Sequence, residues 1–185
     1  MKKLQFTAAL LISMSVIACG GDAKTADASS ETSETAEITA SAEADYEGMK
    51  LTDLTEFGVF ASLQIPDGEK GPVKIENSAT ESVEIMCGTK YGIEIIPFGL
   101  TVAEKKAELD NDLVYTIEYI EDTPEKIIYK KAIQDGDMES EYHFFLTKEI
   151  DGEPYSIQSL NKVYRQKSIE KMVVSAESII ANTPA

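Results

Sequence analysis

The sequence offers few side chains that could take part in acid–base or nucleophilic chemistry. His143 is the single histidine, and it stands between Tyr142 and Phe144 in a segment with strand periodicity. Any catalytic triad with an imidazole base would have to use it. No second histidine or suitable cysteine completes a typical zinc site, so we expect His143 to be a structural or surface residue. Because strand side chains alternate, it should share a face with Phe145.

The two cysteines do not indicate a disulfide framework, because Cys19 lies near the N-terminus and Cys87 lies far along the chain. Cys87 shares a predicted strand face with Val83 and Ile85, which favours a buried, unreactive thiol. A nucleophilic role would need a helix terminus or a basic neighbour, and the sequence shows neither. The G-x-S-x-G, H-E-x-x-H, phosphate-loop and G-x-G-x-x-G motifs do not occur. We expect no catalytic residue, no cofactor and no enzymatic activity.

Acidic residues at every second position of one stretch could supply oxygen ligands to a metal ion. The stretch "QDGDMESE" contains Asp135, Asp137, Glu139 and Glu141. Such a set could bind calcium, but its glycine stands in the wrong position for an EF-hand loop. Alternate acids also describe the solvated face of a strand after a hairpin. We expect no metal site, and calcium binding at residues 135–141 stays open as the alternative.

The charge balance excludes one class of partner. The 185 residues include 33 acids and 17 bases, giving a formal net charge of -16. Nucleic-acid binding requires a clustered basic surface. The pairs Lys105-Lys106 and Lys130-Lys131 both have acids close by and are expected on solvated faces. We expect no nucleic-acid partner.

The N-terminal residues have the pattern of a secretory signal. Two lysines precede a mostly apolar run to Ile17, which is too short and ends too abruptly for a membrane-spanning helix. Val16-Ile17-Ala18-Cys19 resembles the lipobox of bacterial lipoproteins, in which aliphatic and small residues precede an obligatory cysteine. The resemblance implies that 1–18 is a cleaved signal peptide and that the Cys19 thiol carries a diacylglycerol. An ordinary cleaved signal or a retained hydrophobic anchor is the alternative.

Acylation of Cys19 would bind the chain to membrane lipid. Each buried methylene contributes about 0.8 kcal/mol, so two or three acyl chains hold a protein where one is marginal. Gly20 stands where similar Gram-negative lipoproteins carry an aspartate if they are retained in the inner membrane. The resemblance therefore implies a lipid-anchored protein of the cell envelope, at the outer membrane. Which side of that membrane the domain faces stays open.

Residues 19–45 are expected to form a disordered acidic tether after the lipidated cysteine. From Gly20 to Asp45 the sequence is mostly alanine, serine and threonine, with seven acids and one lysine. Its one large apolar residue is Ile38. Such a segment cannot bury enough apolar surface to offset its chain entropy. We expect a single domain at 46–181 and a short tail at 182–185.

Alternating apolar residues predict strands in much of that domain. Phe57, Val59, Ala61, Leu63 and Ile65 fall on one face of the first. Further strands are expected in "PVKIEN", "SVEIMCG", "KYGIEIIPF", "LVYTIEYIED", "EKIIYKKAI", "YHFFLTKEI" and "YSIQSL". Asp135-Gly136 is typical of a hairpin turn, and such short connections require antiparallel pairing.

Two segments have helical periodicity instead. Thr101 and Glu104 have the spacing of a capping box, and apolar residues through Leu113 predict a helix at about 102–112. Near the C-terminus an apolar stripe follows a plausible cap at Ser168. Its members are Ile169, Met172, Val173, Ala176, Ile179 and Ile180. The fold class is therefore α+β, with a mostly antiparallel sheet of about seven or eight strands, an internal helix and a C-terminal amphipathic helix.

From Phe57 to Ile180 this order of elements resembles the Mog1/PsbP-like α/β sandwich, although the chain lacks the tryptophan that often follows the first strand in that group. The resemblance implies a non-catalytic binding or assembly role. We expect a binding or adaptor lipoprotein that presents its domain to another envelope protein. The alternative is a small-ligand carrier or sensor with an aromatic-lined pocket between sheet and helix. The aromatic residues are Tyr115, Tyr119, Tyr129, Tyr142, Phe144 and Tyr155, which could equally form core and cross-strand pairs.

Overall fold

The computed structural model describes residues 46–133 and 139–183. The expected signal peptide, the lipidated Cys19, the tether and the turn residues Asp135 and Asp137 lie outside the described residues. Within the two described ranges, no helix has both the length and the apolar character needed to cross a membrane.

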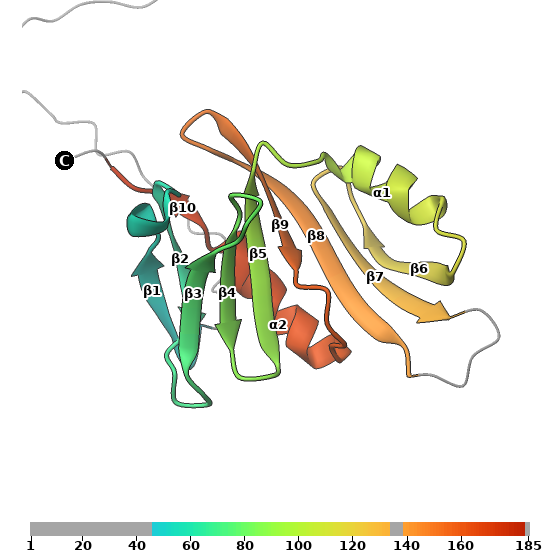
Figure 1. The fold of residues 1–185 in the computed structure, drawn as a ribbon, viewed down its shortest axis with the longest axis horizontal. Coiled ribbons are helices and arrows are strands. Elements are labelled where there is room, and N and C mark those ends of the chain that lie inside the picture. Colours follow the sequence, from blue (N-terminus) through green and yellow to red (C-terminus); the bar gives the residue numbers. More distant parts are fainter. Residues whose placement is uncertain (1–45, 134–138, 184–185) are drawn as a thin grey trace, which may run out of the picture. The chain divides into compact units, whose positions relative to one another are not determined.

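A seven-stranded antiparallel sheet forms most of the fold (Figure 1). Its order is β3 (Val73–Asn77), β4 (Val83–Cys87), β5 (Tyr91–Pro97), β9 (Glu153–Ser159), β8 (Glu141–Ile150), β7 (Lys126–Ile133) and β6 (Tyr115–Asp122). Each neighbouring pair is antiparallel. The expected α+β class and the mostly antiparallel sheet are therefore confirmed.

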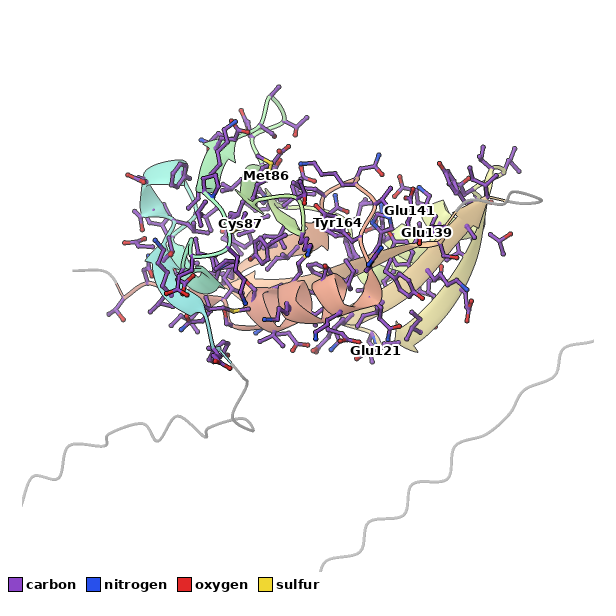
Figure 2. The ribbon with its side chains drawn as sticks, turned by 90° about the horizontal axis from the view of Figure 1, so that it is seen from below. Met86, Cys87, Glu121, Glu139, Glu141 and Tyr164 are labelled. Carbon is purple, nitrogen blue, oxygen red and sulfur yellow. The ribbon has the colours of Figure 1, made fainter. Side chains whose placement is uncertain are left out.

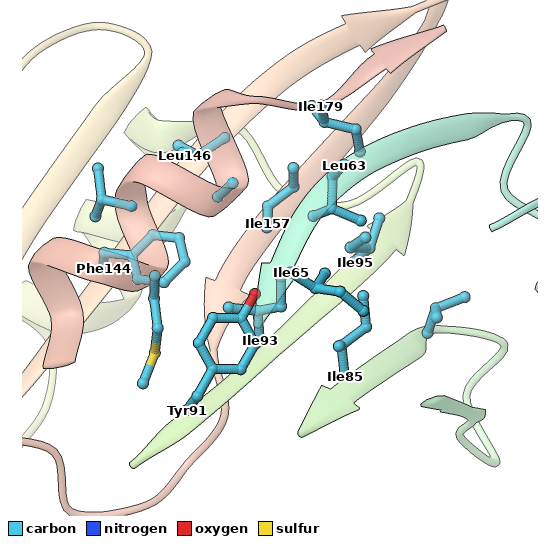
Figure 3. Packing of buried hydrophobic residues seen from close by; sticks show 14 of the residues in the cluster. Leu63, Ile65, Ile85, Tyr91, Ile93, Ile95, Phe144, Leu146, Ile157 and Ile179 are labelled. Atoms are coloured by element: carbon cyan, nitrogen blue, oxygen red, sulfur yellow. The ribbon is translucent and has the colours of Figure 1, made fainter. Parts of the chain in front are cut away.

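The two helices cover opposite faces of this sheet. Phe144 and Leu146 of β8 belong to the larger apolar core, which also contains the buried face of α2 (Gln166–Glu177). Phe145, between them, belongs to a second core beneath α1 (Val102–Asp110). Successive strand residues point to opposite faces, so α1 and α2 lie on opposite sides of β8. Figure 3 shows the larger core, in which aliphatic side chains of β2, β4, β5 and β9 meet the helix.

A second, three-stranded sheet packs against the larger core. It has the order β1 (Met49–Asp53), β2 (Ala61–Pro66) and β10 (Ile180–Ala181). Because β10 is so short, it pairs only with the first two residues of β2. Farther along, α2 and the residue that caps its C-terminus satisfy the backbone of Gln64. The hydroxyl of the cap residue Ser178 accepts from the Gln64 N–H at 2.8 Å, and the hydroxyl of Ser175 in α2 donates to the Gln64 carbonyl.

The N-terminal cap of α1 is as expected. Thr101 Oγ1 accepts from the Glu104 N–H, and the Glu104 carboxylate accepts from the Thr101 N–H, which completes the capping box. The helix ends at Asp110, however, and Leu113 is 92% exposed rather than part of the buried stripe. The Asp112 side chain accepts from the N–H groups of Val114 and Tyr115 and so turns the chain into β6.

Three further boundaries correct the sequence-based expectations. The segment Thr55–Phe57 forms a 3-10 helix, closed by Gly58 with a φ of 87°, so the expected first strand starts only at Ala61. The strand β1 before it was not predicted. Ser168 is not the cap of α2, because that helix begins at Gln166. At its other end α2 stops at Glu177, so the apolar residues after it, including Ile180 of β10, are not helical.

Candidate functional site

His143 lies in β8 on the face that α1 covers, together with Phe145, as its alternation predicts. It is buried, and its ring stacks on that of Tyr129 with 5.5 Å between the ring centroids. Its Nδ1 lies 3.0 Å from Ser159 Oγ, and its Nε2 lies 3.4 Å from Glu141 Oε2. The fold thus places a hydroxyl, an imidazole and a carboxylate in one row.

A serine hydroxyl, a histidine and an acid that follow one another in space form the arrangement in which a base activates a nucleophile. A nucleophile must contact its substrate, whereas Ser159 is 6% exposed and His143 is 4% exposed. Burial lowers the pKa of His143; the nearby Glu141 carboxylate opposes this shift, and the charges of Lys131 and Lys105 add to it. The row links β8 to β9, and burial keeps the imidazole neutral at neutral pH.

The other sequence candidates are also placed by the fold. Cys87 is a free, buried thiol, as expected, and its Sγ lies 3.3 Å from the Gly71 carbonyl oxygen as a donor. Burial raises the pKa of this thiol, which makes it less reactive. Of the acidic turn, Glu139 and Glu141 are described and lie near the start of β8 (Figure 2). Over residues 46–133 and 139–183, no group of three histidine, cysteine or acidic residues is arranged to hold a metal ion.

Most of the aromatic residues that could have lined a ligand pocket pack against other side chains instead. Phe144 is fully buried in the core beneath α2. Tyr129 is buried beneath α1, where it forms a tilted pair with Tyr119 at 6.5 Å between ring centroids. Lys131 Nζ lies 3.9 Å from the centroid of the Tyr115 ring. Tyr155 also packs against the larger core, and in addition it lines a hollow that opens to solvent.

Two hollows open at one end of the large sheet, where the start of α1, the β6–β7 turn and the β8–β9 hairpin come together (Figure 1). The first, which we call the α1 hollow, has a volume of about 400 Å³. Its lining residues are Gly99, Leu100, Thr101, Glu125, Thr147, Lys148, Glu149, Pro154 and Tyr155. The second, the α2 hollow, has a volume of about 350 Å³. Its lining residues are Glu121, Thr123, Pro124, Glu125, Lys126, Leu146, Thr147, Lys148 and Glu177.

Phe98, which immediately precedes the hollow-lining Gly99, has an unusual conformation. It has a φ of 52°, in the left-handed region that bulky residues rarely adopt, and its side chain is 71% exposed. Its N–H donates to the Pro154 carbonyl at 2.9 Å, which ties the loop after β5 to the β8–β9 hairpin. The fold thus presents an aromatic ring to solvent at a cost in backbone strain, a combination found at binding sites. Leu100, 44% exposed, adds a second apolar side chain at the same hollow.

The loop that carries Phe98 sits directly on the sheet. A Cβ atom at Gly99 would lie 1.8 Å from Ser156 Oγ and 2.9 Å from Ser156 Cβ, so only glycine allows this approach. The Ser156 hydroxyl is buried and has no hydrogen-bond partner among the described residues. Close packing over Ser156 therefore sets the position of the loop that carries Phe98.

The charged side chains around the two hollows differ in whether they are paired. Lys148 Nζ donates to the Glu177 carbonyl at 2.9 Å, and Lys126 forms ion pairs with Glu121 and Glu177. Glu125 and Glu149 are exposed at the α1 hollow, and neither has an ion-pair partner in the described part of the chain. The α1 hollow is therefore lined by the apolar Leu100 and by two unpaired carboxylates, while the amino group of its one lysine, Lys148, is bound at Glu177.

Of the residues that line the α1 hollow, only Tyr155 was a candidate for a pocket from the sequence alone. The lining of this hollow comes from a loop, a turn and a hairpin that no motif or spacing connects. The only local signal was Phe98-Gly99 immediately after a strand that ends in proline. No family model, no curated protein and no solved structure matches the chain.

Proposed function

We propose that this protein is a lipoprotein of the cell envelope, anchored at the outer membrane through acylated Cys19, and that its domain binds another envelope protein. The binding is non-catalytic. The observation that carries this role is the exposed ring of Phe98, presented from a strained backbone on the loop whose next residues, Gly99 and Leu100, line the α1 hollow. Aromatic side chains beside concave surfaces supply much of the free energy of protein–protein binding.

The surroundings of Phe98 support protein binding over a small-ligand carrier. The spaces between the sheet and both helices are filled by core side chains, including Phe144 beneath α2 and Phe145 beneath α1. The α1 hollow is open and lies next to a projecting hairpin, so a polypeptide could contact it over a wide area. The Cys19 anchor and the acidic segment after it would hold such a domain near the membrane surface.

In-cell photocrosslinking tests this proposal. A photoreactive phenylalanine analogue replaces Phe98 in the full-length chain, and the same analogue at Val163, which is 60% exposed, is the matched control. We expect a discrete protein adduct from position 98 that the Val163 control does not give and that Cys19→Ser reduces. The same set of adducts from both positions would contradict a binding site at Phe98.

A further inference from the structure

The strand β8 extends beyond the end of β7. The β7–β8 pairing covers Glu141 to Leu146, whereas β8 continues to Ile150 and there pairs with β9 alone. Figure 1 shows this β8–β9 hairpin projecting past the start of β7. One side of Thr147–Ile150, which we call the open β8 edge, therefore has no neighbouring strand in the described structure.

Two hydrogen bonds fix which backbone groups face this edge. The Thr147 N–H donates to the Glu125 carbonyl at 2.9 Å, so the backbone of Thr147 points toward the β7 side. Strand backbone groups repeat every second residue, so the N–H and C=O of Glu149 point the same way. Pro154, which pairs with Glu149, turns its carbonyl in the opposite direction, toward the Phe98 N–H. Glu149 thus offers a free donor and a free acceptor to an added strand.

The two hollows lie on opposite sides of the open β8 edge. Both include Glu125, Thr147 and Lys148 in their linings. Glu149 lines the α1 hollow, while the Lys148 side chain reaches to the end of α2. An extended segment added beside β8 would place alternate side chains in the α1 hollow and the α2 hollow.

Charge indicates the composition of such a segment. A residue opposite Glu149 would lie on the same face as the unpaired Glu149 carboxylate, beside a hollow that the unpaired Glu125 also lines, so a lysine or arginine is favoured there. Leu100 favours an apolar side chain beside it. The acidic residues 20–45 of this chain and a second copy of a chain with net charge -16 both have the wrong charge.

Resting on the proposed binding function, we infer that the open β8 edge recognises an extended, cationic segment of the partner protein by β-strand addition. Backbone hydrogen bonds to Glu149 contribute the affinity, and the two hollows select side chains at alternate positions. A lysine or arginine of the segment pairs with Glu149 and Glu125.

Peptide binding to the full-length lipidated protein in detergent micelles tests this inference. The probe is a fluorescent, end-blocked octapeptide of alternating lysine and valine. Its binding is measured by fluorescence anisotropy. Glu149→Pro removes the N–H that faces the edge and leaves the β8–β9 pairing, because proline is tolerated where the N–H faces away from the partner strand. We expect Glu149→Pro to weaken binding about 10-fold or more, the equivalent of one or two hydrogen bonds with the loss of a charge.

Three controls keep the result interpretable. Glu149→Gln retains the N–H and should weaken binding less than Glu149→Pro, with a smaller dependence on salt. Glu69→Gln removes an exposed acid outside both hollows and should change nothing. N-methylation of every second amide along one edge of the probe should abolish binding to the unaltered protein, so the test does not depend on the folding of a variant.

Two results would overturn the inference: equal binding by Glu149→Pro and the unaltered protein, or equal binding of the N-methylated probe. If these occur while Phe98 still gives its specific crosslink in cells, the proposed binding function stands and only strand addition is wrong. If the crosslink is also absent, the proposed function itself fails.

Discussion

Tyr91 of β5 and Ser175 of α2, which are 84 positions apart, are joined by a hydrogen bond of 2.6 Å between their hydroxyl oxygens. The Ser175 hydroxyl donates in turn to the Gln64 carbonyl of β2. This buried relay connects the large sheet, the helix and the small sheet at one point. It also supplies a partner to a part of β2 that β10 is too short to reach.

Ser175→Ala should cost more stability than Tyr91→Phe. The alanine leaves the Tyr91 hydroxyl and the Gln64 carbonyl without this partner in a buried place, at about 2–3 kcal/mol. The phenylalanine removes one hydroxyl and leaves Ser175 bonded to Gln64, at about 1 kcal/mol. Urea denaturation of both variants gives the two free energies of unfolding. A larger loss for Tyr91→Phe would contradict the donor order of this relay.

The stability of the protein should fall as the pH drops below about 6.5. An unperturbed histidine has a pKa of 6.5, and burial lowers the pKa of folded His143 below this value. Between these two values the unfolded chain binds a proton that the folded chain does not, so the free energy of unfolding decreases toward acid. The full contribution is present above pH 6.5.

His143→Gln should flatten this dependence just below pH 6.5, because glutamine does not titrate. Thermal melting at several pH values measures it. The carboxylates with lowered pKa values, Asp53, Glu104 and Asp112, have ordinary values of 3.8 or 4.5 and affect stability at lower pH. If the slope just below pH 6.5 is unchanged in the variant, the pH dependence of stability belongs to other groups.

Gly99→Ala should displace the loop that presents Phe98. The added Cβ would overlap Ser156 Oγ, and overpacking of this kind costs about 1–3 kcal/mol. Ser156→Ala removes a buried hydroxyl that has no partner in the described structure, so we expect it to be neutral or stabilising. Adding Ser156→Gly should restore part of the stability and of the Phe98 crosslink to Gly99→Ala. Equal crosslinking by Gly99→Ala and the unaltered protein would show that the loop position is not set by this contact.

Cys19→Ser should abolish incorporation of an alkyne-tagged palmitate in cells and release the protein from the membrane fraction. The matched control is Cys87→Ala, because that thiol is buried in the domain and should accept no label. Label that persists in Cys19→Ser would contradict the lipoprotein proposal. A labelled Cys19 with an unlabelled Cys87 is the expected result.

Much of the fold could be predicted from the sequence because its signals are local. The alternation in "SVEIMCG" and "KYGIEIIPF" predicted β4 and β5, and the Thr101–Glu104 spacing predicted the start of α1. The ends of elements were less predictable. Leu113 fits a helical stripe, but the Asp112 side chain captures the N–H groups that follow and ends the helix before it.

The candidate site could not be predicted in the same way. His143 was correctly placed beside Phe145, but its contact with Ser159 depends on how β8 pairs with β9. The α1 hollow depends on three connections that meet only in space, and the open β8 edge depends on one strand being longer than its neighbour.

The sequence by itself determined the α+β class, the strand faces on which His143 and Cys87 lie, and the acidic charge that disfavours nucleic-acid binding. Each of these depends on neighbouring residues or on composition. Only the tertiary structure decided that Ser175 reaches Gln64, that Phe98 stands exposed on a strained loop, and that Glu149 faces an empty edge. These depend on the register between strands and on packing between distant segments. A residue's own neighbours in the chain carry no information about either.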